Sequence, residues 1–118
     1  MRCKMRDKPI YRVKTVTIAA TESLSSVIDM DGYQNVAVIM PTGWDTADLT
    51  FAASTEIDGT FIPIHDTSGE VTITNPAAST AFVLSEQLRP FKFIKIRSGT
   101  SASAVAQTAD RVLIVVQS

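Results

Sequence analysis

The single histidine of the chain, His65, is followed directly by Asp66, and a histidine beside a carboxylate can serve as a general base. We expect both residues at the end of a β-strand, where adjacent side chains point to opposite faces and would not bond each other. A strand-end histidine bonded to water or backbone is the better interpretation. Ser98, Ser101 and Ser103 have no histidine nearby in the sequence to activate them, so the sequence predicts no catalytic residue.

A metal site is not expected either. Asp29, Asp31 and Gly32 have a faint likeness to a calcium loop, in which alternate acidic residues gather oxygen ligands around one cation. The EF-hand spacing fails, because Tyr33 stands at the next alternate position and Met40 at position 12 of such a loop. A turn with positive φ at Gly32 is the better interpretation, although a Ca²⁺ site assembled from several loops stays open. With one cysteine and one histidine, we expect no thiolate cluster, no imidazole-rich site and no cofactor.

Two aromatic residues outside the apolar strands, Tyr33 and Trp44, are candidates for stacking against a sugar ring. Asp45 and Asp48 stand close to Trp44 and could grip sugar hydroxyls. A lone tryptophan beside a strand is more often a plug at the end of a sheet or an anchor in an interface. A glycan site at Tyr33, Trp44 and Asp45 is therefore the alternative interpretation and not the first one.

The net charge of −1 hides a strong asymmetry along the chain. Residues 1–14 hold six basic residues and one acidic residue, a charge of +5, which leaves about −6 on the remainder. A basic segment on an acidic body can seek nucleic acid or dock on an acidic neighbouring subunit. We favour the subunit, because no aromatic residue precedes Tyr11 to stack a base. The candidate partner-binding residues are Arg2, Lys4, Arg6, Lys8 and Arg12.

The domain organisation follows from length and pattern. A chain of 118 residues builds one core, so we expect a basic arm over residues 1–12 and a single domain over residues 13–118. No apolar run approaches the roughly 20 residues of a membrane span, and we expect a soluble protein without a membrane partner.

Short strands at regular spacing, with no convincing helical period, indicate an all-β fold. One β-hairpin is expected from 49–53 and 61–64, with a turn at 56–59 and a tight connection at 67–69. The run at 36–40 is nearly continuous in apolar residues, which favours a strand covered on both faces, whereas 49–53 alternates like a half-buried strand. A helical turn, if any, is expected at 84–88. The other strands are expected at 13–20, 24–30, 71–74, 80–85, 91–97 and 111–117.

Eight or nine such strands favour an antiparallel β-sandwich, and the count fits a jelly roll. The seven-stranded immunoglobulin type is the competing topology, but its usual Cys-Trp-Cys signature is absent.

Two stretches carry a family resemblance, WDTADLTFAASTEIDGTFIPIHDTSGEVTI and LRPFKFIKIRSGTSASAVAQTADRVLIVV. They resemble small β-sandwich structural proteins encoded among the virion genes of tailed bacteriophages, over roughly residues 35–118. The matching elements are Trp44, Leu49–Ser54 and residues 58–63, 66–69, 93–101 and 107–111.

The resemblance implies a non-enzymatic virion component, assembled in the host cytoplasm and located in the virion. A capsid decoration or cement protein is the expected role, with neck or tail accessory proteins and a glycan-binding module as alternatives. The implied partners are other virion proteins, the major capsid protein first, and copies of the chain itself. No catalytic residues carry over.

Overall fold

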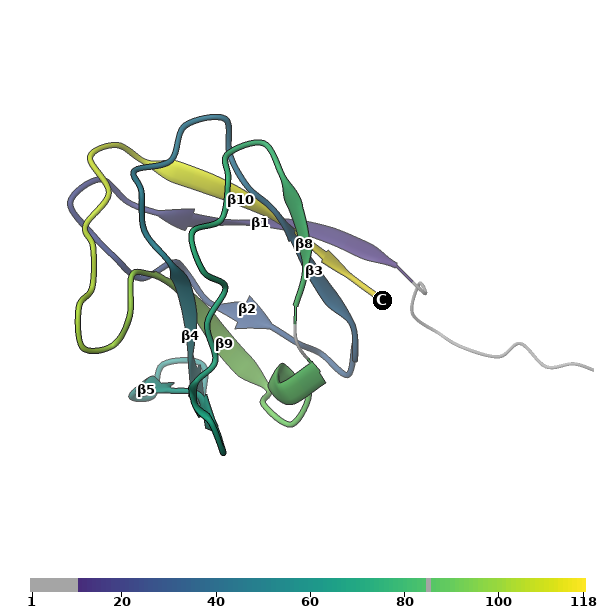
Figure 1. The fold of residues 1–118 in the computed structure, drawn as a ribbon. Helices are drawn as coiled ribbons and strands as arrows, with labels where there is room; N and C mark the ends of the chain where they lie inside the picture. Colours follow the sequence, from purple (N-terminus) through teal and green to yellow (C-terminus); the bar gives the residue numbers. More distant parts are fainter. Residues whose placement is uncertain (1–10, 85) are drawn as a thin grey trace, which may run out of the picture.

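Short β-strands form almost all of the regular structure in residues 11–84 and 86–118, the part of the chain that the computed structural model describes. Figure 1 shows them as two layers of arrows that face each other. The strands are β1 (Arg12–Ile18), β2 (Ile28–Asp29), β3 (Val36–Ile39), β4 (Leu49–Ser54), β5 (Ile62–Pro63), β6 (His65–Asp66), β7 (Gly69–Glu70), β8 (Ala81–Val83), β9 (Phe93–Ser98) and β10 (Arg111–Gln117).

The strand order is that of a jelly roll. The first sheet has the order β1-β10-β3-β8, and the second has the order β2-β9-β4-β5. Every pairing is antiparallel, and early strands pair with late ones: β1 with β10, β2 with β9 and β3 with β8. Such nesting is what two interlocked Greek keys produce. The expectation of an antiparallel, jelly-roll-like β-sandwich is confirmed, and β6 and β7 form a separate two-stranded hairpin between β5 and β8.

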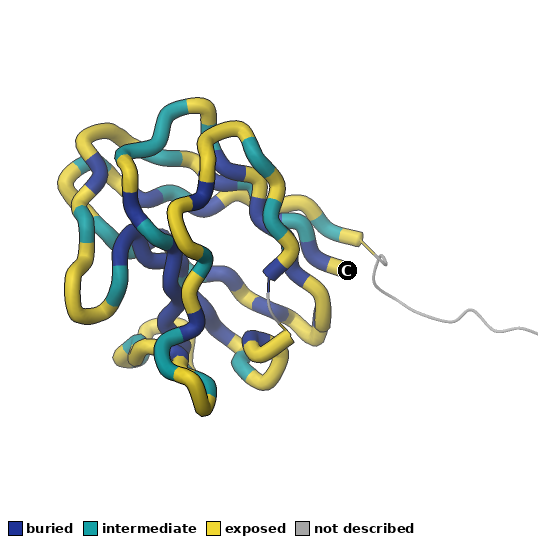
Figure 2. Tube along the Cα trace, in the orientation of Figure 1, coloured by how far each residue is buried: buried dark blue, intermediate teal, exposed yellow. Residues whose placement is uncertain are grey.

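The core lies between the two sheets, where the dark blue segments of Figure 2 meet. Alternation along each strand sends every second side chain inward. Full burial of one such aliphatic or aromatic side chain contributes about 1.5–3 kcal/mol. The largest fully buried apolar side chains are Phe51, Ile18, Leu49, Leu88, Ile94, Ile96 and Leu113.

Two expected strands are almost lost, and the strand expected at 80–85 is shortened to the three residues of β8. Residues 71–74 contribute one isolated bridge, in which Ile73 exchanges backbone hydrogen bonds of 2.8 and 2.9 Å with Leu49. Most of this edge of β4 already pairs with β5 and with Ile64, whose N–H donates to the carbonyl oxygen of Phe51. Only Leu49 is left for residues 71–74, and Ile73 pairs with it. Residues 24–30 likewise keep only β2, because this segment crosses from one sheet to the other and touches Ile18 and Arg97 through single bridges.

The expected turns are present. The connection at 67–69 is the turn of the β6–β7 hairpin, and the helical turn is a 3-10 helix at Glu86–Leu88. No helix of the described residues is long and apolar enough to cross a membrane.

Burial of β3 and β4 is the reverse of what their patterns predict. The expectation that 36–40 is covered on both faces is wrong, because Ile39 is exposed on the outer face of the first sheet. The expectation that 49–53 is half-buried is also wrong, because all five of these residues are buried. The physical reason lies in tertiary packing. Glu70 and the loop at Gly99 pack over the outer face of β4, whereas no described segment packs over Ile39 to the same extent.

Candidate functional site

Arg12 is the one member of the predicted partner-binding set that lies within the described residues; Arg2, Lys4, Arg6 and Lys8 lie outside them. Its guanidinium group is held by three neighbours. Nε donates to Oε1 of Gln117 at 2.9 Å, Nη2 to the carbonyl oxygen of Asp29 at 2.7 Å, and Nη1 to Oδ2 of Asp31 at 3.2 Å. The same guanidinium lies over the ring of Tyr33, 4.8 Å from its centre, in cation–π geometry.

Local structure explains why these groups meet. Arg12 begins β1, not the arm, and stands opposite Gln117 at the end of β10. Asp31 and Gly32 have φ values of 47° and 80°, and Tyr33 N–H bonds the carbonyl oxygen of Met30, which together make the tight turn expected at Gly32. The turn therefore places Asp31 and Tyr33 against Arg12. Arg12 thus stabilises its own fold by linking the start of β1 to this turn and to β10.

The acidic residues of this turn are matched with cations of the chain. Lys92 Nζ lies 3.8 Å from Oδ1 of Asp29, and the same oxygen accepts the backbone N–H of Asp31. Among the described residues, no group of three or more ligating side chains could hold a metal ion.

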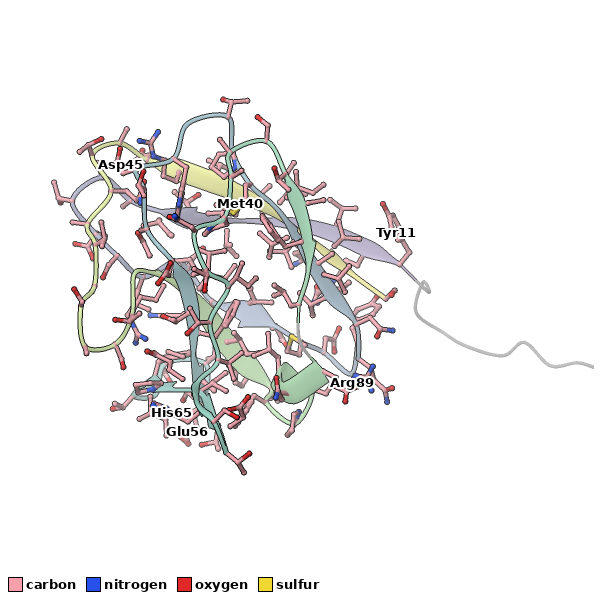
Figure 3. The ribbon with its side chains drawn as sticks, viewed as in Figure 1. Tyr11, Met40, Asp45, Glu56, His65 and Arg89 are labelled. Atoms are coloured by element: carbon pink, nitrogen blue, oxygen red, sulfur yellow. The ribbon has the colours of Figure 1, made fainter. Side chains whose placement is uncertain are left out.

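Two further cations stand at this end of the sandwich, and sequence reasoning missed both. Arg89 and Lys92 flank Pro90 in the loop before β9, and their side chains are about half exposed. They border a shallow cleft of about 350 Å³ that also includes Gly32 and Tyr33. Figure 3 shows Arg89 at the lower right corner of the molecule, below Tyr11 in this view. The signal that could have found them is the Arg-Pro-Phe-Lys sequence at the end of a strand-breaking turn.

The residues of the alternative glycan site do not share a surface. Tyr33 is buried beside Arg12, which pairs with Gln117 at the end of β10. Asp45, next to Trp44, pairs with Arg111 at the start of β10. The two aromatic residues therefore lie toward opposite ends of β10, a strand about 20 Å long at roughly 3.4 Å per residue.

Trp44 itself is half-buried and packs against the core. Its Nε1–H donates to the carbonyl oxygen of Ala47 at 3.3 Å, so the indole stabilises the loop between β3 and β4 to which it belongs. This is the plug at the end of a sheet that the sequence offered as the simpler interpretation.

Asp45 is the centre of a polar cluster that ties the loop before β10 to the sandwich. Its carboxylate accepts the backbone N–H of Thr108 at 2.7 Å and the Thr108 hydroxyl at 3.2 Å, and it pairs with Arg111 Nη2 at 3.1 Å. The hydrogen bonds from Thr108, followed by the charge of Arg111, hold the pKa of Asp45 below its ordinary value. The buried Gln107 joins the cluster by accepting from the backbone N–H of Asp45 and donating to Ser98 Oγ.

His65 and Asp66 do not act as a pair. Asp66 accepts the N–H of Ser68 at 2.7 Å and the amide of Gln87 at 2.8 Å, while His65 is exposed opposite Glu70 in the β6–β7 hairpin. Ser98 is fully buried, where its hydroxyl oxygen accepts from Gln107. In the described structure Asp66 and Ser98 therefore take part in hydrogen bonds within their own chain, and Asp66 does not bond His65.

Comparison with known proteins gives a likeness in fold. No family model and no curated protein matches the sequence. The chain is similar in structure to the crystal structure of SPBc2 prophage-derived protein YomS, with a TM-score of 0.54 and 12% sequence identity. The match covers 96% of this chain and 98% of that chain, so the likeness in fold extends over nearly all of both chains.

Proposed function

We propose that the chain is a non-enzymatic structural component of a tailed-phage virion, and specifically a capsid decoration or cement protein. One observation carries the proposal: the fold matches that of a prophage-derived protein along nearly its entire length. The virion-protein resemblance of the two sequence stretches that contain Trp44 and Phe93 supports the same class. Fold alone does not define a function, so the polar groups are the second support.

The polar side chains that could do chemistry are engaged in holding loops. Asp45, Asp66 and Ser98 each bond groups of their own chain, and the acidic turn at Asp29 and Asp31 is matched by Arg12 and Lys92. A rigid body with fixed loops suits a protein that binds other subunits of a particle. Its role is then to add contacts, not to turn over a substrate.

The end of the sandwich at which the chain enters β1 is the proposed contact with the particle. Residues 1–8, which precede β1 in the sequence, include Arg2, Lys4, Arg6 and Lys8, and Arg89 and Lys92 of the described residues are about half exposed at this end. Arg89 and Lys92 are each paired with a carboxylate, Glu86 and Asp29, so the excess positive charge comes from residues 1–8, which hold four basic residues and one acidic residue. A basic segment favours an acidic surface on the partner, for which the major capsid protein is the first candidate. A neck or tail accessory protein would use the same end and is separated from a head protein only by which particle part it binds.

Pelleting on phage heads emptied of DNA tests the proposal. We expect the full chain to sediment with heads, and a chain lacking residues 1–10 to bind at least tenfold more weakly. The deletion must stop before Tyr11, because Arg12 fastens β1 to Gln117 and to the turn at Asp31. Binding should also weaken as salt rises from about 0.05 to 0.5 M, since exposed charges are screened within a Debye length of about 10 Å or less.

A matched control keeps the length of the chain. Replacing Arg2, Lys4, Arg6 and Lys8 with glutamine removes the charges without shortening the arm, and it should reproduce the effect of the deletion. If neither the full chain nor the variants bind heads, the decoration role is wrong. Binding of the full chain to isolated tails would then assign it to the tail.

A further inference from the structure

The outer face of the first sheet is apolar and uncharged. Cross-strand register places its side chains in two rows that run over all four strands, followed by a shorter row on β1 and β10. The first row is Val13, Val116, Ala37 and Val83; the second is Thr15, Ile114, Ile39 and Ala81; the third is Thr17 and Val112. None of these ten positions carries a charge, in a chain with 23 charged residues of the DEKR type.

Several of these side chains are far more exposed than their chemistry favours. Val83 is 86% exposed, Val13 is 51% exposed, Val112 is 48% exposed and Ile39 is 37% exposed. Tyr11, 58% exposed, stands at the start of β1 beside this face (Figure 3). Contiguous exposed apolar area of this kind on a soluble domain marks an interaction surface.

One border of the face is also an open sheet edge. β8 is the last strand of the first sheet and pairs only with β3 among the described residues. Natural sheets protect such edges with lysine, proline or a bulge, but Ala81, Phe82 and Val83 contain none of these. The edge is short, three residues, and this limits its use as a template for a foreign strand.

We propose that the outer face of the first sheet binds the same face of a second copy of the chain, sheet upon sheet, about a twofold axis. The absence of charge favours an apolar partner, and a second copy of the chain supplies such a surface. A charged partner would lose the hydration of its charges against an apolar surface that offers no counter-charge. A second copy brings a face of equal size and polarity, and a twofold axis lets each surface complement itself. β-branched side chains on two such faces interdigitate at a sheet separation of about 10 Å.

The area of the face sets the strength of the dimer. The four strands have seven, seven, four and three residues. At about 4.8 Å between strands and about 3.4 Å per residue, they make a face on the order of 350 Å². A stable interface takes about 800 Å² from each partner. The isolated face is therefore expected to give a weak dimer that forms with rising protein concentration, in the micromolar to millimolar range. In a particle, where copies are held close together, the effective concentration would favour it.

Sedimentation velocity of the purified full chain, from about 1 μM to about 1 mM, tests this proposal. We expect the wild-type chain to move from monomer to dimer over this range. Val112→Lys and Val83→Lys should each raise the concentration for half-association at least tenfold, because each would place an ammonium group inside the dimer. Val112→Thr, which keeps the β-branched shape, should give a smaller shift in the same direction.

Matched controls place the same substitution elsewhere. Ile57→Lys and Ile62→Lys change isoleucines that are 58% and 62% exposed in the β4–β5 turn and in β5 of the second sheet. Both should associate as the wild type does. The proposal is overturned if the chain stays monomeric up to about 1 mM, or if the control variants weaken association as much as Val112→Lys does.

The experiment is independent of the capsid role, because it uses the purified chain without heads. A monomeric wild-type chain whose binding to heads is abolished by Val112→Lys would assign the face to a virion partner and overturn self-association. Dimerisation that Val112→Lys disrupts, in a chain that does not bind heads, would support self-association and overturn the decoration role alone.

Discussion

The two sheets of the sandwich treat their outer faces in opposite ways. On the first sheet, Val13, Ile39 and Val112 point outward, and they remain exposed. On the second sheet, the outward side chains of β4 are Thr50 and Ala52, and both are fully buried. The more polar outer face is thus the covered one, and the apolar outer face is the open one.

The cover over the second sheet comes from its own chain. Glu70 of β7 reaches across β4 to Arg97 of β9, with 3.2 Å between the carboxylate and Nη1, and both side chains are nearly buried. Arg97 also donates to Thr50 Oγ1 at 3.4 Å, and Thr50 donates to the carbonyl oxygen of Gly99 at 2.7 Å. The backbone N–H of Ser101 bonds the same Glu70 carboxylate and brings the loop after β9 into the cover.

The difference shows how one small domain can combine stability with association. The second sheet satisfies polar groups internally and is closed to partners over β4. The outer face of the first sheet carries no charged side chain that would need a hydrogen-bond partner. A binding partner can therefore exclude water from this face at a small desolvation cost. Changes to the second sheet should therefore appear as lost folding stability, and changes to the first as lost association.

The largest expected effect comes from opening the cover. Glu70→Ala leaves the guanidinium of Arg97 nearly buried without its counter-charge, which typically costs about 3–5 kcal/mol when one partner of a buried pair is removed. We expect the free energy of unfolding, measured by urea denaturation at pH 7, to fall by that order. The outer face of the first sheet should be unaffected, so dimerisation of the folded fraction should persist.

Two controls sharpen that result. Removing both charges, as in Glu70→Leu with Arg97→Met, should recover most of the lost stability, because no unpaired charge remains. Glu86→Ala breaks the exposed pair with Arg89, whose atoms are 3.9 Å apart, and should cost no more than about 1 kcal/mol. Equal losses of unfolding free energy in Glu70→Ala and Glu86→Ala would show that the Glu70–Arg97 pair stabilises the fold no more than an exposed ion pair does.

Most strands could be predicted from the sequence because strand patterns are local, although the pattern at 71–74 gave only one bridge and that at 24–30 only the two residues of β2. Residues 111–117 form β10 with the expected bounds, and the β4–β5 hairpin pairs as its turn chemistry required. Burial could not be predicted in the same way, because it depends on which distant segment lies over a face. The alternation in β4 shows that Thr50 is polar, and a polar residue is expected to face solvent. Thr50 is buried because Glu70 and the loop at Gly99, both distant in the sequence, pack over it.

The polar clusters were beyond prediction for the same reason. Arg12 was assigned to a partner by its place in a basic run, yet it bonds Gln117 at the other end of the chain. The Asp45 cluster joins residues more than 60 positions apart, and Asp45 was considered only as a neighbour of Trp44. A charge count can be made from the sequence alone. The hydrogen-bond partner of a charged side chain depends on the topology of the fold, which brings together strand ends that are distant in the sequence.

One substitution made on both outer faces tests the comparison directly. Thr50→Val removes a hydroxyl that bonds Gly99 and Arg97 in the closed cover, and should cost about 1–3 kcal/mol of unfolding free energy. Thr15→Val changes an exposed residue on the outer face of the first sheet and should stay within about 0.5 kcal/mol of the wild type. Chevron or equilibrium urea curves measure both. If Thr15→Val is as costly as Thr50→Val, the two faces do not differ as described.

The smallest effect is expected from acid, through the cluster that holds the far end of the loop after β9. Because the pKa of Asp45 is lowered from its ordinary 3.8 by Thr108 and Arg111, the folded state binds its proton less readily than the unfolded state does. The stabilisation is thus fully present above about pH 4 and is lost as the pH falls through the lower, folded-state pKa.

Asp45→Asn removes this dependence. The variant should be less stable than the wild type at pH 7, and the gap between their urea midpoints should narrow steadily below about pH 4, because protonation removes the same charge from the wild type. A gap that stays constant down to pH 2.5 would mean that the carboxylate charge contributes nothing to holding Thr108 and Arg111. A narrowing gap would show that the charge of Asp45 helps to hold the far end of the loop after β9 through Thr108 and Arg111.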